Sequence, residues 1–294
     1  MTPRPTTIGA SEPDRRAFPL ATCPAERGTA VTIRRIELFG ISFSDVTFED
    51  VCQCIDDRVK SGDPGYIVTP NVDHVCLFDR DPAFRQAYSH AFLVLVDGVP
   101  VVWASRLLGE PLRQKLSGSD MVPALSEFAA QEGYSVFLLG AAEGIAAIAS
   151  ARLQEQYPAL QVVGAYAPPM GFYDDERANT EVVRRVRESG AQLCFVALGA
   201  PEQVTWMYHN CESCGTPVMI GVGAGLDFVA GHRKRAPLWM QRTGLEWVWR
   251  LIHEPRRLWR RYLIDDLRFL PIVLREFGRR RRKRASEPQS GAEG

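Results

Sequence analysis

The chain has 294 residues, 46% of them hydrophobic, which allows one large folded domain with an appendage and makes disulfide staples unnecessary. The odd number of cysteines, seven, fits a reducing cytosol. No apolar run reaches the roughly 18 to 20 residues that span a bilayer, so any membrane contact is expected to be peripheral. The 35 basic and 35 acidic residues balance overall, but residues 250–284 carry about +9, from 13 Arg or Lys against four Asp or Glu, and the remainder about −9.

The first 30 residues contain five prolines and no apolar block between a basic start and a small-residue cleavage site. They do not match a secretory signal, and we expect residues 1–30 to be disordered. Residues 31–43 are strand-like, with a possible hairpin at Gly40. Helical spacing follows at Phe48, Val51, Ile55 and Val59.

Beyond this helix, short apolar runs alternate with helical segments. Several of these runs end on Gly, Asp or Asn, which is typical of buried parallel strands in βαβ units. We therefore predict an open, mostly parallel α/β sheet within a catalytic domain of residues 31–240. The runs are residues 66–68, 92–96, 135–139, 160–163, 193–198 and 218–220.

Small or hydrogen-bonding residues directly follow five of these runs. In open α/β sheets, ligands bind outside the carboxyl ends of the strands. These segments are therefore expected to share one cleft at the edge of the sheet. They are residues 69–71, 97–98, 140–142, 199–203 and 221–225, which include Gly140 and Gly199.

Asp97 is the candidate general base, because its carboxylate emerges at a strand end, where it can take a proton from an attacking hydroxyl. The alternative is a turn or a helix N-cap. Thr69 and Asn71 flank Pro70 at another strand end, where both side chains can hydrogen-bond a sugar or phosphate. Turn chemistry explains the same residues without a function.

Gly221, Gly223 and Gly225 allow backbone amides to approach a diphosphate, which the N-terminus of a following helix would favour. The spacing is not that of the dinucleotide-binding fingerprint, because Leu226 stands where the third glycine would be. A nicotinamide cofactor is therefore disfavoured, and we expect no cofactor.

Two motifs suggest a metal, but each has a simpler interpretation. Asp79 and Asp81 frame an acidic triplet of the kind that holds a divalent ion, yet Asp81 precedes Pro82, which favours a helix cap. Cys211 and Cys214 have half the spacing of a zinc site, without a second pair. They are expected to be ordinary thiols in a loop before a strand, so no metal site is predicted.

The C-terminal segment combines apolar residues at near-helical spacing with closely spaced arginines, and Pro255 interrupts the helix between them. A basic amphipathic appendage over residues 241–284 favours an anionic lipid surface. Nucleic acid is the alternative partner, and a surface helix with a solvated basic tail is a third interpretation. Residues 285–294 are expected to be disordered.

Short motifs recur in a fixed order between about residue 33 and residue 265. They are Thr69-Pro70-Asn71-Val72-Asp73-His74, Val96-Asp97-Gly98, Gly118-Ser119-Asp120, Phe137-Leu138-Leu139-Gly140-Ala141, Gly164 with Gly171-Phe172-Tyr173, Ala197-Leu198-Gly199-Ala200-Pro201-Glu202-Gln203, Gly221-Val222-Gly223-Ala224 with Asp227-Phe228, Ala230-Gly231, Arg235-Ala236-Pro237, and Leu245-Glu246-Trp247 running to Glu254-Pro255-Arg256-Arg257. Together they resemble the WecG/TagA/CpsF family of bacterial cell-surface polysaccharide glycosyltransferases.

The resemblance implies a Rossmann-like fold with helices on both faces of the sheet and a C-terminal membrane appendage. It implies an inverting, metal-independent transfer of a sugar from a UDP-sugar to a saccharide on a polyprenyl diphosphate, at the inner face of the cytoplasmic membrane. Asp97 matches the base, Thr69 and Asn71 match pocket residues, and Gln203 matches a residue near the nucleotide sugar. Five arginines match contacts to the lipid-linked diphosphate: Arg250, Arg256, Arg257, Arg260 and Arg261.

One departure from the family's motifs affects the predicted identity of the donor sugar. The family commonly has Pro-Lys-Gln-Glu where this chain has Pro201-Glu202-Gln203-Val204, so the rim of the pocket loses one cation and one carboxylate. The donor is therefore not restricted to the N-acetylmannosamine type. The rival hypotheses are an inert α/β scaffold that binds nucleic acid through its basic tail and a nucleotide-sugar oxidoreductase that requires NAD. A homo-oligomer is compatible with the sequence.

Overall fold

A computed structural model describes residues 31–286, with side chains to residue 282. Residues 1–30 and 287–294, which hold most of the predicted disorder, lie outside the described residues. Residues 285 and 286 were also expected to be disordered, but the last helix continues through them. Within the described part of the chain, no helix is both long and apolar enough to cross a bilayer.

The core of the molecule is a parallel sheet of six strands in the order β4-β3-β8-β7-β5-β6. The fold is therefore the predicted open α/β sheet, Rossmann-like in architecture. Every predicted run forms a strand, although β4 pairs over only two residues. The strands are β3 (Tyr66–Val68), β4 (Leu93–Val94), β5 (Ser135–Gly140), β6 (Gln161–Tyr166), β7 (Leu193–Ala197) and β8 (Val218–Gly221).

The central strands are buried on both faces because they alternate between two apolar layers. In β7, Cys194 and Val196 pack into one layer, whereas Leu193 and Phe195 pack into the other. The first layer is covered by α2 (Val72–Arg80), α3 (Pro82–Ser89), α4 (Val99–Leu107), α7 (Glu176–Glu188) and α8 (Glu202–Cys214). The second is covered by α1 (Phe48–Ser61), α5 (Gly118–Glu132), α6 (Ile145–Gln156) and α9 (Gly225–Val229).

The predicted hairpin is confirmed at the start of the described chain. β1 (Arg34–Leu38) pairs antiparallel with β2 (Ile41–Asp45). The turn between them requires a positive φ at Phe39 (+59°) and at Gly40 (+81°). At the second position glycine adopts this conformation without strain. The ring of Phe39 also packs edge-on against Phe269, so the hairpin contacts the C-terminal segment.

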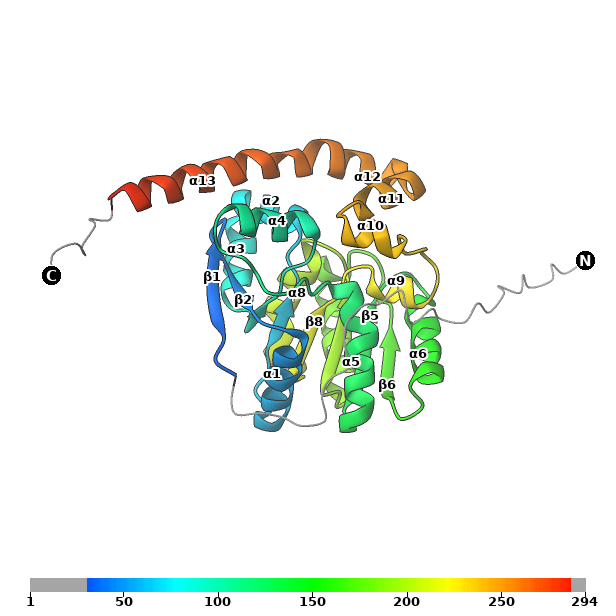
Figure 1. Cartoon of the computed structure of the whole chain (residues 1–294). Helices are drawn as coiled ribbons and strands as arrows, with labels where there is room; N and C mark the ends of the chain where they lie inside the picture. The colour runs from blue at the N-terminus through cyan, green and yellow to red at the C-terminus, as the bar shows by residue number, and fades with distance from the viewer. Residues whose placement is uncertain (1–30, 287–294) are drawn as a thin grey trace, which may run out of the picture.

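The C-terminal appendage lies across the carboxyl end of the sheet (Figure 1). Its helix breaks at Pro255, as predicted, because a proline at the first position of a new helix ends the preceding one. The last helix buries Ile272 and Val273 in the core layer that contains α2. The elements are α10 (Leu238–Arg242), α11 (Glu246–His253), α12 (Pro255–Arg260), the single turns η3 (Arg261–Asp265) and η4 (Asp266–Arg268), and α13 (Phe269–Ser286).

Of the two motifs that were weighed as metal sites, the structure confirms the helix-cap interpretation of Asp81 but not the loop position of the two cysteines. Asp81 caps α3, because its carboxylate accepts hydrogen bonds from the backbone N–H groups of Ala83 and Phe84, as the capping interpretation predicted. Cys211 and Cys214 do not lie in a loop: they occupy the last turn of α8 and are buried. The helix extends further than expected because the αL conformation that ends it falls at Gly215.

Candidate active site

Two cavities meet at the carboxyl edge of the sheet. The small cavity, about 350 Å³, lies between α4 and the appendage. The large cavity, about 940 Å³, lies over the ends of β3, β5, β7 and β8. The residues that line both cavities mark where they join: Asn71, Asp97, Ser119, Arg250 and Arg261.

Asp97 stands at this junction, two residues before α4. Its backbone N–H donates to the carbonyl of Pro70 at 2.9 Å, which holds the two strand ends together. The structure does not support a capping role for Asp97, because Gly98, with φ of +93°, is the N-cap of α4 and no side chain caps this helix. The carboxylate is therefore available to the cavities.

The surroundings of Asp97 make it a stronger base than an ordinary carboxylate. Burial raises the pKa of the Asp97 carboxyl to about 7. The positive charges of Lys115 and Arg235 oppose this rise in pKa. The negative charges of Glu246 and Asp120 add to it. Asp97 thus titrates near neutral pH, where a general base is most effective.

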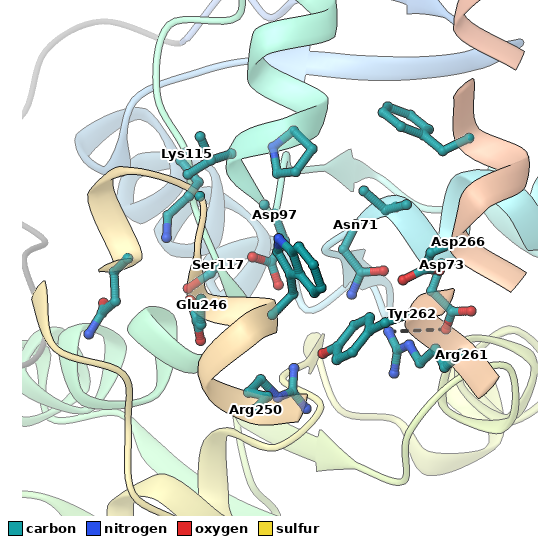
Figure 2. A pocket seen from close by; sticks show the side chains of 18 of the residues that line it. Asn71, Asp73, Asp97, Lys115, Ser117, Glu246, Arg250, Arg261, Tyr262 and Asp266 are labelled. Carbon is teal, nitrogen blue, oxygen red and sulfur yellow. Dashed lines mark ion pairs between the residues drawn. The ribbon is translucent and has the colours of Figure 1, made fainter. Parts of the chain in front are cut away.

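Lys115 is a cation that the sequence interpretation missed. It lines the small cavity, as Figure 2 shows, and its ammonium group lies 3.8 Å from Asp120. Asp120 is itself 1% exposed, accepts a 2.6 Å hydrogen bond from Ser117 and pairs with Arg235. The network holds Lys115 beside the junction, where it adds positive potential.

The predicted polar residues of the strand ends converge on the large cavity. Thr69 lines it and donates to the carbonyl of Gly221 at 3.0 Å. Asn71 caps α2 by accepting from the backbone N–H of His74, and it also lines both cavities. Gln203 is 3% exposed, lines the large cavity and accepts a 2.9 Å hydrogen bond from Gly223 N–H. Sequence reasoning therefore placed these residues correctly in space.

The predicted glycines divide into two groups. Gly199 and Gly223 line the large cavity. Gly140 and Gly221 do not, and their role is to allow close approach: a Cβ on Gly140 would lie 2.5 Å from the carbonyl oxygen of Ala197, and one on Gly221 would collide with the side-chain amide of Gln203.

The expected cradle of glycine amides for a diphosphate is not what the structure shows. Gly223 N–H donates to Gln203, and Gly225 N–H donates to the carbonyl of Val222 at 2.9 Å. Both amides are used within the protein because the segment turns back on itself before α9. Positive potential at the cavities comes instead from side chains.

The five predicted arginines are not equivalent. Arg250 and Arg261 line both cavities, and Arg257 lines the large one, where it pairs with Glu254 at 2.6 Å. Arg256 and Arg260 line neither cavity and are exposed on α12. The helical period separates them from the cavity face. Arg233, which was not predicted, lines the large cavity and pairs with Asp227 at 3.4 Å.

A partly buried charge cluster joins the appendage to α2 (Figure 2). Arg261 forms an ion pair with Asp73 at 3.1 Å. Burial raises the pKa of Asp266 to about 7, with Arg261 opposing and Asp73 adding to the rise. Burial also raises the pKa of Asp73. Arg261 was predicted, and Asp73 and Glu246 belong to the family motifs, but their interactions were not predicted. Lys115 and Asp266 were not singled out in the sequence, since these side chains meet the others only when the appendage folds over the sheet.

A Rossmann-like sheet with a base-like carboxylate and several cations at its carboxyl edge suits a glycosyltransferase, and the family match identifies the chain as one. The chain belongs to the "Glycosyl transferase WecG/TagA/CpsF family", whose model matches residues 36–284. Among curated proteins it is 33% identical over 198 residues, 67% of this chain and 74% of the relative, to an "N-acetylglucosaminyldiphosphoundecaprenol N-acetyl-beta-D-mannosaminyltransferase" of Bacillus spizizenii.

A protein of the same name from Staphylococcus aureus strain MW2 is 28% identical over 251 residues, 85% of this chain and 94% of the relative. The match therefore extends through most of the catalytic domain and the appendage. The chain is therefore a glycosyltransferase of the family that it was found to resemble.

Proposed function

We propose that this enzyme transfers a sugar from a UDP-sugar to a saccharide carried on a polyprenyl diphosphate, with inversion at the anomeric carbon. The names of its relatives specify an acceptor of this chemical type, N-acetylglucosamine on undecaprenyl diphosphate. The observation that carries the proposal is the position of Asp97, a carboxylate with a pKa of about 7 at the junction of two cavities.

The two cavities suit the two substrates. The large one opens over the ends of four strands, where α/β folds bind nucleotides, and Arg233 and Arg257 there supply charge for a diphosphate. The small one contains Lys115 and Arg250 as cations and the apolar side chains of Trp247, Leu263 and Leu267 from the appendage, which suits a sugar diphosphate followed by an isoprenoid chain. We therefore place the donor in the large cavity and the acceptor in the small one.

The reaction follows from this arrangement. The acceptor hydroxyl attacks the anomeric carbon from the face opposite UDP, so a new C–O bond forms as the bond to the UDP oxygen breaks. The carboxylate of Asp97 takes the hydroxyl proton. UDP leaves with the bonding electron pair, and the guanidinium groups of Arg250 and Arg261 stabilise its charge.

The same proposal places the enzyme on the inner face of the cytoplasmic membrane. The appendage carries most of the excess positive charge, and its arginines at positions 268, 281 and 282 are exposed. Exposed Leu270, Leu274 and Phe277 lie between the first two of these cations, and exposed Trp247 and Trp259 precede them in the appendage. Cations together with apolar side chains bind anionic lipid surfaces.

The donor sugar is the open part of the proposal. Glu202 lines the large cavity where the family commonly has a lysine, and its negative charge raises the pKa of the nearby Tyr173 phenol. A carboxylate at this place disfavours an anionic donor such as a uronic acid, because like charges repel. We therefore propose a neutral or amino sugar as the transferred group.

The test is a transfer assay with a panel of UDP-sugars and polyprenyl-diphosphate-linked N-acetylglucosamine. We expect transfer from at least one neutral or N-acetylated donor, with inverted anomeric configuration in the product by NMR. The Asp97→Asn variant serves as the control for background turnover. Absence of transfer from every donor, or retained configuration in the product, would overturn the proposed function.

A further inference from the structure

The mouth of the small cavity is surrounded by exposed apolar side chains. Trp247 of α11, Leu263 of η3 and Leu267 of η4 line the cavity and yet are 40%, 49% and 63% exposed. The outer part of this cavity is therefore apolar and open to solvent, whereas its inner part holds Asp97 and Lys115.

The catalytic domain contributes to the same rim through α4. Val99 and Pro100, in the first turn of α4, line the cavity. One turn further, Trp103 is 53% exposed, and a Cβ built on Gly244 of the cavity wall would lie 3.5 Å from its indole ring. We call Trp103, Trp247, Leu263 and Leu267 the cavity rim.

The rim continues into longer apolar surfaces on both sides. On α4, Leu107 follows Trp103 by four residues, on the same helix face, and is 65% exposed. On the appendage, exposed apolar side chains recur every three or four residues, as on one face of a helix. Leu263 and Leu267 are followed by Leu270, Leu274 and Phe277. The opposite face of α13 packs on the core, and the side chains of this stripe remain exposed.

We propose that the cavity rim and Leu107 enter the boundary between headgroups and acyl chains, so that α4 of the catalytic domain, together with the appendage, holds the enzyme on the bilayer. The polyprenyl chain of the acceptor then leaves the small cavity through the rim directly into the lipid. This inference rests on the proposed function for the identity of the acceptor. It assigns to Trp103 and Leu107, far from the appendage in sequence, a share of membrane binding.

The charges around the stripe favour lipid over a second copy of the chain. Arg268, Arg281 and Arg282 are exposed on the appendage near the apolar residues. In a two-fold dimer through this stripe, the cationic appendages of the two copies would face each other, and like charges would oppose association. An anionic headgroup layer instead neutralises them while the leucines bury their surface.

The experiment compares Trp103→Ser/Leu107→Ser with a control, Ile148→Ser/Val163→Ser, which removes two exposed apolar residues remote from both cavities. We expect the α4 variant to lose about tenfold or more in affinity for vesicles of phosphatidylglycerol and phosphatidylethanolamine. Its kcat/KM should fall with an undecaprenyl acceptor but not with a short, water-soluble prenyl acceptor. The control variant should match the wild type in both assays.

Each other result overturns the inference. Unchanged vesicle binding means that α4 does not contact lipid, and an equal loss on both acceptors means that Trp103 supports the site rather than the membrane. A change in molecular mass without lipid, measured by light scattering, identifies the stripe as a contact between copies. Failure of the proposed function has a different signature: the wild type would transfer to neither acceptor, while the vesicle assay would still compare the variants.

Discussion

Arg261 in the first turn after α12 and Asp73 in the first turn of α2 form an ion pair at 3.1 Å across the boundary between the appendage and the catalytic domain. Both side chains are largely buried, and Arg261 lines both cavities. The pair therefore connects the position of the appendage to the electrostatics of the active site.

Removal of either partner of this pair should loosen the appendage. We expect Arg261→Gln and Asp73→Asn each to lower kcat/KM for the lipid-linked acceptor. In the double variant, the loss of transition-state stabilisation should be smaller than the sum of the losses in the two single variants. A coupling free energy of about 0.5–3 kcal/mol is the usual range for residues in contact. Steady-state kinetics of the four proteins measures it, and strict additivity would contradict a functional link between the two residues.

Asp97→Asn should keep the fold and donor binding but reduce transfer by about a hundredfold or more, the usual scale for a general base. In the wild type the carboxyl must be ionised to accept a proton. Because its pKa is raised to about 7, activity should be fully present above this pH and fall as the pH decreases through it. A pH profile of kcat/KM tests this, and near-normal turnover of Asp97→Asn would exclude the residue from the mechanism.

Glu246→Gln should shift that pH profile. The negative charge of Glu246 contributes to the raised pKa of Asp97, so the neutral amide should move the acidic limb of the profile to lower pH. The rate at high pH should change by less than about tenfold. Glu155→Gln, an exposed change on α6, is the matched control, and an unshifted limb in Glu246→Gln would show that the two carboxylates do not interact.

Gly221→Ala should mimic the loss of Gln203. A Cβ at this position would collide with the buried amide of Gln203, which holds the turn at Gly223 beside the large cavity. We expect a rise in KM for the donor with little change in KM for the acceptor, and a similar pattern in Gln203→Ala. The neighbouring change Gly223→Ala has open space for its Cβ and strains only the backbone. Unchanged donor kinetics in Gly221→Ala would contradict this role for Gln203.

The sequence predicted the sheet and much of the candidate site because both follow from local patterns. Apolar runs mark buried strands, and parallel strands bring their carboxyl ends to one edge, so Thr69, Asp97 and Gln203 were placed together without coordinates. Lys115 and Glu246 were not predicted as site residues. Their roles depend on the packing of a loop and of α11 around Asp97, and a charged residue outside a strand end has no local pattern that distinguishes it from surface.

The expectations that failed were also local ones. The glycines of residues 221–225 suggested backbone N–H groups that were available to a ligand. Whether such a group is available depends on side chains that are distant in sequence, such as Gln203 of α8, which accepts the hydrogen bond from Gly223. The thiols of Cys211 and Cys214 appeared to lie in a loop because the helix that holds them has a mixed pattern of polar and apolar residues. Periodicity alone did not locate its end.

The contact between α13 and the hairpin β1–β2 has a consequence for biosynthesis. Arg280 hydrogen-bonds the carbonyl of Glu37 and lies 3.6 Å from Glu110, so the last helix is secured by acceptors made much earlier. The last strand of the sheet ends at Gly221, and α13 begins at Phe269. The whole sheet is therefore synthesised before the residues of α13 that fasten the helix to the hairpin and to Glu110.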